Sequence, residues 1–519
     1  MIRRSPLALP ALLLAAFAIN LDTTIVNVAL PTLARELHAS NSQLQWIVDA
    51  YNLVFAACLL AAGSLSDRLG RKGMLLSGLT VFGLASAAGG LAADTSQLIA
   101  ARCVMGLGAA MAFPATLSLI SNIFTERTER ARAIGLWGAT AGIAIALGPI
   151  AGGWLLGRLS WASIFFAMAP VAAAGAWLIA RHVPTSREDD ARPLDRAGFG
   201  LSTAATSLLV YTIIEAPDQG WGSLRSVAGF LAAGALLAGF IIWEKRSSAP
   251  MLDVSLFRNA RFSAACGAVT VSFFTLLGFI FVITEYFQLI KHYDPLSAGV
   301  HLLPVALSVG VASVLGTKLA VRIGTKLIVT AGLLMVTAFY AWVATVSTTT
   351  SYGTIAAQMV LYGVGMGLTS APATEAIMGV VPTAKAGVGS AVNDATRLLG
   401  GTLGVAVIGS VYASVYASRL TAALPKALPH AVVSLAQSSA GAALTVAGRL
   451  TASGQHTAAV AVHDAAARAL VDGLSAGCLV AAGVALAGAF AAALLLPAQP
   501  VGALDALSDV PARSVAQTA

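Results

Sequence analysis

Long apolar runs, separated by short polar segments, follow one another along the chain until about residue 496. Crossing the roughly 30 Å hydrocarbon core of a bilayer takes about 20 helical residues, and the backbone satisfies itself there only as a helix or a closed barrel. Membrane strands would alternate in polarity, and these runs do not. We predict an all-α polytopic membrane protein with fourteen spans, near residues 8–33, 44–65, 73–93, 98–124, 134–156, 162–181, 197–215, 226–243, 262–290, 296–318, 326–346, 354–379, 388–413 and 473–496.

An internal repeat relates the two ends of this series of spans. The loop after span two reads GSLSDRLGRKGMLLSGL from Gly63, and the loop after span ten reads GTKLAVRIGTKLIVTAGL from Gly316. Four residues recur 254 positions later. Arg68, Gly70, Lys72 and Gly78 correspond to Arg322, Gly324, Lys326 and Gly332. At that offset spans one to six match spans nine to fourteen, and parallel repeats of this kind pack around a site at the membrane midplane. The repeat predicts a transporter with two pseudo-symmetric six-helix bundles and two inserted helices, spans seven and eight.

The same division predicts four parts along the chain. They are an N-terminal bundle (1–181), the inserted pair with cytoplasmic linkers (182–260), a C-terminal bundle (261–496) and a disordered cytoplasmic tail (497–519). The C-terminal bundle includes a long outer loop, 414–472, that is rich in Ala and poor in charge. We expect a pair of surface helices in that loop.

Composition and charge agree with a membrane protein. Of the 519 residues 57% are hydrophobic and only 10% are charged, too few to cover the surface of a soluble protein of this length. With the N-terminus inside, most of the 31 Lys and Arg residues fall in cytoplasmic loops. The positive-inside rule therefore places both termini in the cytoplasm, and we expect a multi-pass protein of a bacterial inner membrane. This asymmetry explains the net charge of +8, so nothing favours nucleic-acid binding.

Enzyme and metal motifs do not stand out in the sequence. The four cysteines lie in apolar segments without pair spacing, and the seven histidines are scattered. The chain contains no HExxH, Walker loop or Ser/His/Asp pattern. We expect neither an enzyme, nor a metal site, nor a cofactor.

Ionisable side chains inside spans are candidates for function, because each costs roughly 2.5 to 3.5 kcal/mol at the bilayer centre. At about 100° per residue, Asn20, Thr23 and Asn27 share one face of span one, whereas Asp22 lies 100° to 160° from them. Span one is thus polar on two sides and should be surrounded by other helices. Arg102 is the only charge in span four, so its donors need a partner, for which span one is the natural source.

Four acids within the spans, Asp22, Asp49, Glu285 and Asp394, also have a purely structural interpretation. Asp22 would lock helix packing by accepting hydrogen bonds, and Asp49, six residues into span two, would mark the helix entrance. Glu285, near the outer end of span nine, would snorkel toward the surroundings of Lys291. Asp394 and Arg397 lie three residues apart on one helical face and would neutralise each other.

Two ordered motifs resemble the major facilitator superfamily, and within it the fourteen-span drug:proton antiporters that include the staphylococcal quaternary-ammonium exporters. The likeness covers about residues 8–496. LDTTIVNVALP, from Leu21 to Pro31, matches the family's span-one signature without a gap. The loop motif GxLaDRxGrkxxl matches Gly63 to Leu75. The resemblance implies a gating role for this loop, with these residues in register: Gly63, Asp67, Arg68, Gly70, Arg71 and Lys72.

Further positions carry the resemblance into the mechanism. It implicates Arg102 in proton coupling, and WIVDAYNLVFA is similar to the exporters' span-two segment, including its acid, Asp49. GPIAGG matches the GPxxGG antiporter motif of exporters, and the motif with its flanking glycine comprises Gly142, Gly148, Pro149, Gly152 and Gly153. Asp394 falls at the exporters' acidic position in span thirteen, although Arg397 nearby departs from the pattern. Span ten lacks the acid of some exporters, and Glu285 stands where many relatives carry Gln.

Taken together, these features predict a proton-coupled antiporter that exports amphipathic drugs or antibiotics, either cationic or neutral. The proton-coupling candidates are Asp22, Arg102 and Asp49. The substrate-cavity candidates are Glu285, Asp394, Asn393 and Asn27. The expected partners are the substrate, protons and the lipid bilayer, and we expect a monomer. Two alternatives stay open, an uptake symporter of the same fold and a membrane enzyme or sensor without transport.

Overall fold

The computed structural model describes residues 6–124, 126–185, 195–247, 250, 252, 254–381, 386–424 and 428–497. These residues form helices and connecting turns without a strand, so the all-α prediction is confirmed for the part that the structure describes. The predicted disordered tail, 497–519, lies outside the described residues from 498 onward.

Fourteen helical segments occupy the positions of the predicted spans. The N-terminal ones are α1 (Ala8–Ile25), continued by the 3₁₀ turn η1 (Val26–Ala29) and α2 (Leu30–Glu36), then α3 (Asn41–Leu69), α4 (Arg71–Gly90), α5 (Thr95–Ile123), α6 (Arg127–Leu156) and α7 (Ala162–His182). The inserted pair is α8 (Arg196–Gln219) and α9 (Leu224–Arg246). After the 3₁₀ turn η2 (Val254–Arg258) come α10 (Ala260–Glu285) with the π-helical turn η3 (Tyr286–Ile290), α11 (Pro295–Val300) with α12 (Leu303–Ile323), α13 (Thr325–Val343), α14 (Tyr352–Val380), α15 (Ala386–Ala423) and α18 (His456–Leu495). Twelve of the fourteen are apolar enough to cross a membrane, and α3 and α14, with 29 residues each, complete the set.

Polar caps begin several of these helices after short loops. Ser40 forms a capping box with Gln43, in which each side chain bonds the other's backbone N–H. Asp94 and Ser351 cap α5 and α14 by accepting the backbone N–H of the third residue of each helix. In these three helices a side chain therefore accepts one of the free N–H groups of the first turn.

The two repeated loops adopt the same turn, which supports the internal repeat. Gly70 separates α3 from α4 with φ 110°, and Gly324 separates α12 from α13 with φ 96°. A side chain is strained at these φ values, which explains why glycine occupies both positions. Each turn joins two antiparallel helices through a single residue.

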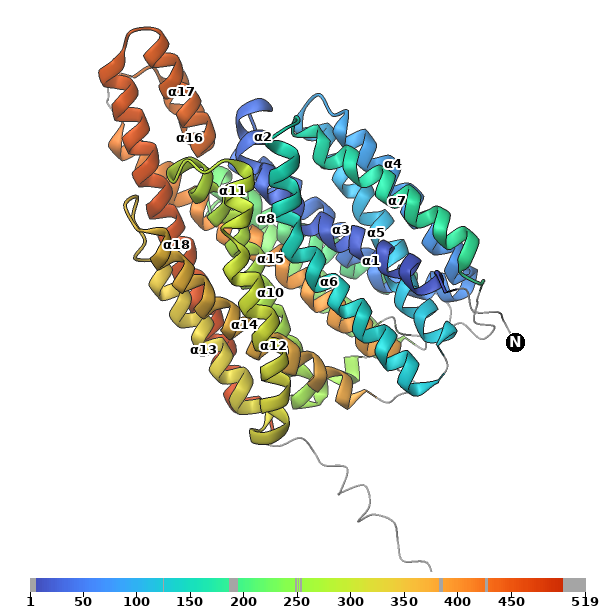
Figure 1. The fold of residues 1–519 in the computed structure, drawn as a ribbon. Helices are drawn as coiled ribbons and strands as arrows, with labels where there is room; N and C mark the ends of the chain where they lie inside the picture. The colour runs from blue at the N-terminus through green and yellow to red at the C-terminus, as the bar shows by residue number, and fades with distance from the viewer. Residues whose placement is uncertain are drawn as a thin grey trace, which may run out of the picture.

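The helices form two groups, with α1 to α7 on one side and α10 to α15 with α18 on the other (Figure 1). The groups meet where α3 packs on α15 and where α6 packs on α11, and Gln288 Nε2 donates to the carbonyl of Val28 at 2.8 Å. We call the end of the molecule that holds α2 and α11 the α2 end. The domain limits at residues 181, 260 and 496 stay a prediction.

The long loop 414–472 differs in part from its prediction. It contains two helices beside the bundle, α16 (His430–Ser438) and α17 (Ala440–Ala452), as expected (Figure 1). Its two ends, however, belong to the neighbouring spans, since α15 runs to Ala423 and α18 starts at His456. Alanine has the highest helix propensity, so the Ala-rich flanks extend the spans beyond the apolar runs.

Candidate functional site

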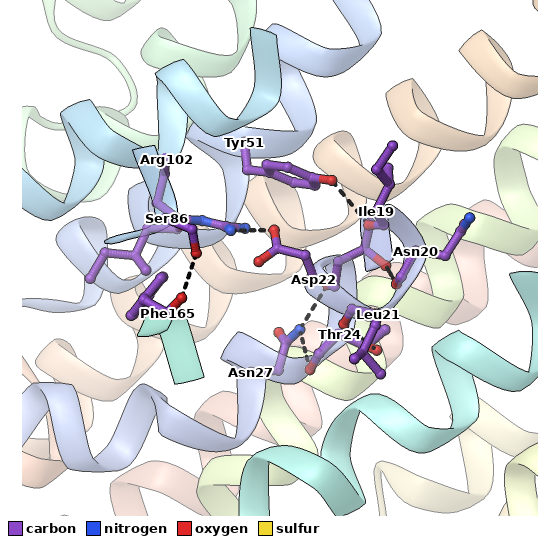
Figure 2. A network of polar contacts seen from close by, with 12 residues as sticks. Ile19, Asn20, Leu21, Asp22, Thr24, Asn27, Tyr51, Ser86, Arg102 and Phe165 are labelled. Carbon is purple, nitrogen blue, oxygen red and sulfur yellow. Dashed lines mark hydrogen bonds and ion pairs between the residues drawn. The ribbon is translucent and has the colours of Figure 1, made fainter. Parts of the chain in front are cut away.

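Asp22 and Arg102 form a buried ion pair between α1 and α5. Asp22 is 0% exposed and Arg102 is 1% exposed. The Nη1 atom of Arg102 lies 2.5 Å from Oδ2 of Asp22, as Figure 2 shows. The pairing of Arg102 with span one, predicted from the sequence, is thus confirmed. Such a pair persists away from water only when further bonds satisfy its remaining groups.

Residues of α3 hold the guanidinium from the other side. Arg102 Nε donates to the carbonyl of Ile47 at 2.9 Å, and the guanidinium carbon lies 4.3 Å from the ring centroid of Tyr51. Tyr51 in turn donates its hydroxyl to the carbonyl of Ile19 at 3.0 Å. Oδ1 of Asp22 has no hydrogen-bond partner among the described residues. The carboxyl group therefore has one oxygen held by Arg102 and one without a hydrogen-bond partner among the described residues.

The chain changes its winding just after Asp22. Thr24 donates to the carbonyl of Ile145 in α6 at 3.1 Å, and the 3₁₀ turn η1 follows. Asn27 donates to the carbonyls of Thr23 and Thr24 at 3.3 Å each. Asn27, proposed from the sequence to line the substrate cavity, is 2% exposed and supports the backbone of its own helix.

The glycines of GPIAGG let α6 approach α1 and α11 very closely. A Cβ atom on Gly148 would overlap the hydroxyl of Thr24, and one on Gly152 would lie 2.7 Å from the carbonyl oxygen of Ile25. A Cβ on Gly153 would lie 2.6 Å from the Cα of Leu296 in α11. The motif therefore packs the signature helix on one side and the C-terminal bundle on the other.

Two further residues define the limits of this motif. Gly299 of α11 faces the backbone of Pro149, since a Cβ there would lie 2.6 Å from the carbonyl carbon of Pro149. Gly142 is exposed and would have nothing within 4 Å of an added Cβ. Gly142 thus takes no part in the close packing that its neighbours make.

Asp49 is buried completely, so its interpretation as a helix-entrance residue is wrong. It is 0% exposed, because it lies two turns inside α3, where α8 and α15 cover that helix. Neither of its carboxyl oxygens has a hydrogen-bond partner among the described residues. Gln45 and Asn52, four residues before and three after, are also 0% exposed and lie on the same face. This polar stripe was not predicted, although its i, i+4, i+7 spacing in an apolar span is a signal that could have revealed it.

Glu285 does not snorkel toward the surface, and that interpretation is also wrong. It is 2% exposed, and its Oε2 accepts a hydrogen bond of 2.7 Å from the hydroxyl of Tyr412 in α15. The helix continues through η3, which leaves Glu285 deeper than its distance from the end of the apolar run suggests. Lys291 instead donates to the carbonyl of Thr348 at 2.9 Å. Tyr412 was not predicted, and only the three-dimensional packing identifies it.

The polar residues of α15 form a looser group. Arg397 donates to the Thr374 hydroxyl at 3.3 Å and lies over the ring of Phe273, 5.2 Å from its centroid. Asn393 accepts from the same Thr374 hydroxyl at 3.1 Å. No ion pair within 4 Å joins Asp394 to Arg397 in the described part of the chain, so their mutual attraction acts over a longer distance than predicted.

The proposed gating loop lies at the opposite end of the molecule from α2. Gly63 is half-buried, Arg68 is exposed, Arg71 is half-buried at the start of α4, and Gly70 forms the turn described above. Lys72 donates to the carbonyl of Ala180 at the end of α7, at 2.8 Å. The side chain of Asp67 lies outside the described residues.

Comparison with known proteins places this arrangement in a family. The model of the Major Facilitator Superfamily matches residues 12–405. Multidrug resistance protein Stp of Mycobacterium tuberculosis is 36% identical over 409 residues, which cover 79% of this chain and 76% of Stp. The multidrug efflux pump LfrA of Mycolicibacterium smegmatis is 35% identical over 409 residues, covering 78% of this chain and 79% of LfrA. The methylenomycin A resistance protein of Streptomyces coelicolor is 35% identical over 398 residues, covering 76% of this chain and 82% of that relative.

A solved structure shares the fold. A bacterial homologue of the human lysosomal transporter Spinster, in an inward-facing and unoccupied conformation, superposes with a TM-score of 0.66 at 17% identity. The match covers 95% of this chain and 98% of that protein.

Proposed function

This chain belongs to the Major Facilitator Superfamily, and we propose that it is a multidrug efflux transporter in which Asp22 and Arg102 couple drug export to proton entry. The relatives named for multidrug resistance or efflux support export, and a transporter rather than an enzyme is the activity that this family indicates. The observation that carries the coupling is the carboxyl group of Asp22, with one oxygen on Arg102 and the other without a partner in the described chain.

The geometry suggests how a proton would act. Protonation of Asp22 removes its negative charge and with it most of its attraction for Arg102. The guanidinium then depends on the Ile47 carbonyl and the Tyr51 ring, both on α3. A gain or loss of one proton therefore changes how strongly α1 is held against α3 and α5. Since α1 also packs on α6, which contacts α11 of the other bundle, such a change would bias how one bundle rocks against the other in alternating access.

The charges along the central helices favour a cationic substrate. Four acids and two bases lie in this region: Asp22, Asp49, Glu285 and Asp394 against Arg102 and Arg397. With every group ionised, two negative charges would remain without a basic partner, and such charges need protons or a cation to be stable in a membrane. We propose that lipophilic cations and protons alternate in meeting this requirement.

The same excess bears on stoichiometry and on orientation. Exchange of one proton for one monovalent cation moves no net charge, whereas a second proton adds about 2.3 kcal/mol per 100 mV of membrane potential. We place the α2 end outside and both termini in the cytoplasm of a bacterial inner membrane, with the transporter as a monomer. In that orientation the packing of α6 on α11 lies on the outer side, which supports our assignment of the structure to an inward-facing state.

The decisive test compares Asp22→Asn with the exposed control Asp94→Asn in everted membrane vesicles. Asp94 caps α5, and asparagine caps a helix equally well, so this control should transport normally. Asp22→Asn should abolish proton-driven ethidium accumulation and the proton release that ethidium causes in the purified protein. Proton-driven accumulation by Asp22→Asn at the control rate would show that another group carries the proton. Ethidium moving out of everted vesicles as protons move out would instead show a symporter.

A further inference from the structure

The inserted helix α8 lies across the line where the two bundles meet. We call this line, along which α3 packs on α15, the seam. Figure 1 shows α8 behind these two helices, and α8 contacts both. Val210, Ile213 and Ile214 of α8 form one buried cluster with Leu53 of α3 and Ala406 of α15. The inserted pair is thus attached to both bundles at once.

A proline in α8 leaves one backbone carbonyl without its helical donor, and a side chain of the C-terminal bundle donates to that carbonyl instead. Pro217 has no N–H group, so α8 cannot close the helical bond to the carbonyl of Ile213, four residues earlier. Ile213 is 7% exposed, and a buried carbonyl without a donor is costly. The hydroxyl of Ser410, on α15, donates to this carbonyl at 2.8 Å. A side chain from another bundle therefore replaces a backbone bond of α8.

Ser410 also connects to α3 across the seam. Its Oγ lies 3.1 Å from Oε1 of Gln45, and both side chains are 0% exposed. The Ser410 hydroxyl has one proton but faces two acceptors, Oε1 of Gln45 and the carbonyl of Ile213. If the Gln45 amide is flipped, its Nε2 donates to Ser410 Oγ, and the Ser410 hydroxyl donates its proton to the Ile213 carbonyl. This flip would also use Nε2 of Gln45, which has no partner among the described residues. One hydroxyl group thus joins α3, α8 and α15.

The remaining polar contacts of the inserted pair are unequal. Trp221, in the loop after α8, donates its Nε1–H to the Ser414 hydroxyl of α15 at 3.1 Å. Between α3 and α8, the direct side-chain bond found among the described residues is the one that Trp46 Nε1 donates to Oε1 of Glu215 at 3.2 Å. Ser410, the donor to Ile213, is 0% exposed, whereas Trp46 and Glu215 are half-buried and Trp221 is 42% exposed, so these last three residues can exchange their partners for water.

We infer that the inserted pair is carried by the C-terminal bundle and acts as a latch on the N-terminal one. Ser410 and Ser414 anchor α8 and its loop to α15, while Trp46–Glu215 and Gln45–Ser410 hold α3 against them. The latch keeps the α2 end closed and releases when α3 and α15 separate. This inference rests on the alternating access in the proposed function.

Spin-label distances in the full-length chain, with its four cysteines replaced, test which bundle carries α8. Exposed positions at the α2 end are available on α8 (Asp218), on α15 (Ser418), in the first turn of α5 (Ser96) and in the loop before α14 (Thr349). On addition of ethidium or protons, the distance between spin labels at Ser96 and Thr349 should lengthen as the α2 end opens. Asp218–Ser96 should lengthen with it, and Asp218–Ser418 should stay constant.

The opposite pattern, with Asp218–Ser96 constant and Asp218–Ser418 lengthening, would overturn the inference and leave the proposed function intact. No change in Ser96–Thr349 under any condition would overturn alternating access at this end and the latch together. Trp46→Phe should raise the ratio of open to closed forms by about fivefold, the effect of one hydrogen bond. A ratio equal to that of the unmodified chain would contradict the latch.

A double-mutant cycle tests the anchor. Ser410→Ala should lower the melting temperature of the purified protein, because it leaves the Ile213 carbonyl without a donor. In a Pro217→Ala background the new N–H of residue 217 can bond that carbonyl, so Ser410→Ala should cost much less. Ser272→Ala is a matched control, since this buried serine bonds only its own helix, at Ala268, and should not couple to Pro217→Ala. Additive effects of Ser410→Ala and Pro217→Ala would show that Ser410 does not serve the carbonyl.

Discussion

Gly153 offers a sharp test of how closely the two bundles must approach at the α2 end. In Gly153→Ala the new Cβ would lie 2.6 Å from both the Cα of Leu296 and the carbonyl carbon of Pro295. Ordinary van der Waals contact begins near 3.4 Å, so α6 and α11 must separate by about 1 Å. The obstructing atoms belong to the backbone of α11 and cannot turn away as a flexible side chain would.

The cost of this overlap can be estimated. Overpacking a close contact destabilises it by about 1–3 kcal/mol. The cost arises only while α6 packs on α11, so it changes the balance between the closed and open forms of the α2 end. A difference of this size corresponds to a shift of about 5- to 150-fold in their ratio. Gly299→Ala, whose Cβ would meet the Pro149 backbone at 2.6 Å, should shift the ratio in the same direction.

The matched control lies in the same helix. Gly142→Ala adds the same methyl group at an exposed position with nothing within 4 Å, so it should leave the ratio unchanged. The distance between spin labels at Ser96 and Thr349 reports the ratio, and ethidium efflux reports its effect on transport. A Gly153→Ala protein with the same distance distribution and efflux rate as Gly142→Ala would refute the close-packing argument.

Two further predictions concern charge. Asp22→Asn and Arg102→Met should each lower the free energy of unfolding by about 3–5 kcal/mol, because each leaves one member of a buried pair without its partner. The double variant should regain stability but should not regain proton coupling. Melting curves in detergent would show this, and additive losses in the double variant would contradict it. Asp294 accepts the N–H of Ser297 at 2.7 Å, and these bonds at the start of α11 hold its pKa below the ordinary value of 3.8. The stability that the cap gives to α11 is fully present above pH 3.8 and is lost as the pH falls through the lowered pKa of Asp294. Amide exchange in α11 should therefore become faster at low pH. If exchange became faster to the same extent in Asp294→Asn, the cap would be excluded as the cause.

The features that the sequence predicts correctly follow from local rules. A lone Arg in an apolar span requires a partner, and this requirement alone is enough to predict the pairing of Arg102 with span one. The recurrence of Gly70 as Gly324 predicts that the two loops are related, and the structure gives both glycines positive φ values that favour glycine. Apolar runs of sufficient length similarly predict the order of all fourteen spans.

The incorrect predictions concern how deeply a side chain is buried and which way it points, and both depend on neighbouring helices that the pattern of one segment does not specify. The burial of Asp49 depends on α8 and α15 covering α3, and that of Glu285 depends on a helix that continues past its apolar run. Asp394 and Arg397 share a helical face as predicted, yet Arg397 turns to Thr374 on another helix. The bond from Ser410 to Ile213 joins residues 197 positions apart, so only the proline signals the free carbonyl in advance.

The internal repeat relates the helices of the two bundles but does not relate their buried charged residues, and this difference bears on the proposed mechanism. At the offset that matches the two loops, the positions of Asp22 and Arg102 correspond to Leu276 and Ala356, so the C-terminal bundle has no counterpart of the ion pair. Its buried acid, Glu285, lies nearer the α2 end and is held by a tyrosine hydroxyl instead of a base. Two similar bundles allow the molecule to rock symmetrically. Among the described residues, however, the buried salt bridge through which a proton would act in the proposed mechanism lies in the N-terminal bundle, whereas the Arg419–Asp472 pair of the C-terminal bundle is exposed. In the proposed mechanism, the direction of proton coupling therefore comes from residues that the repeat does not share.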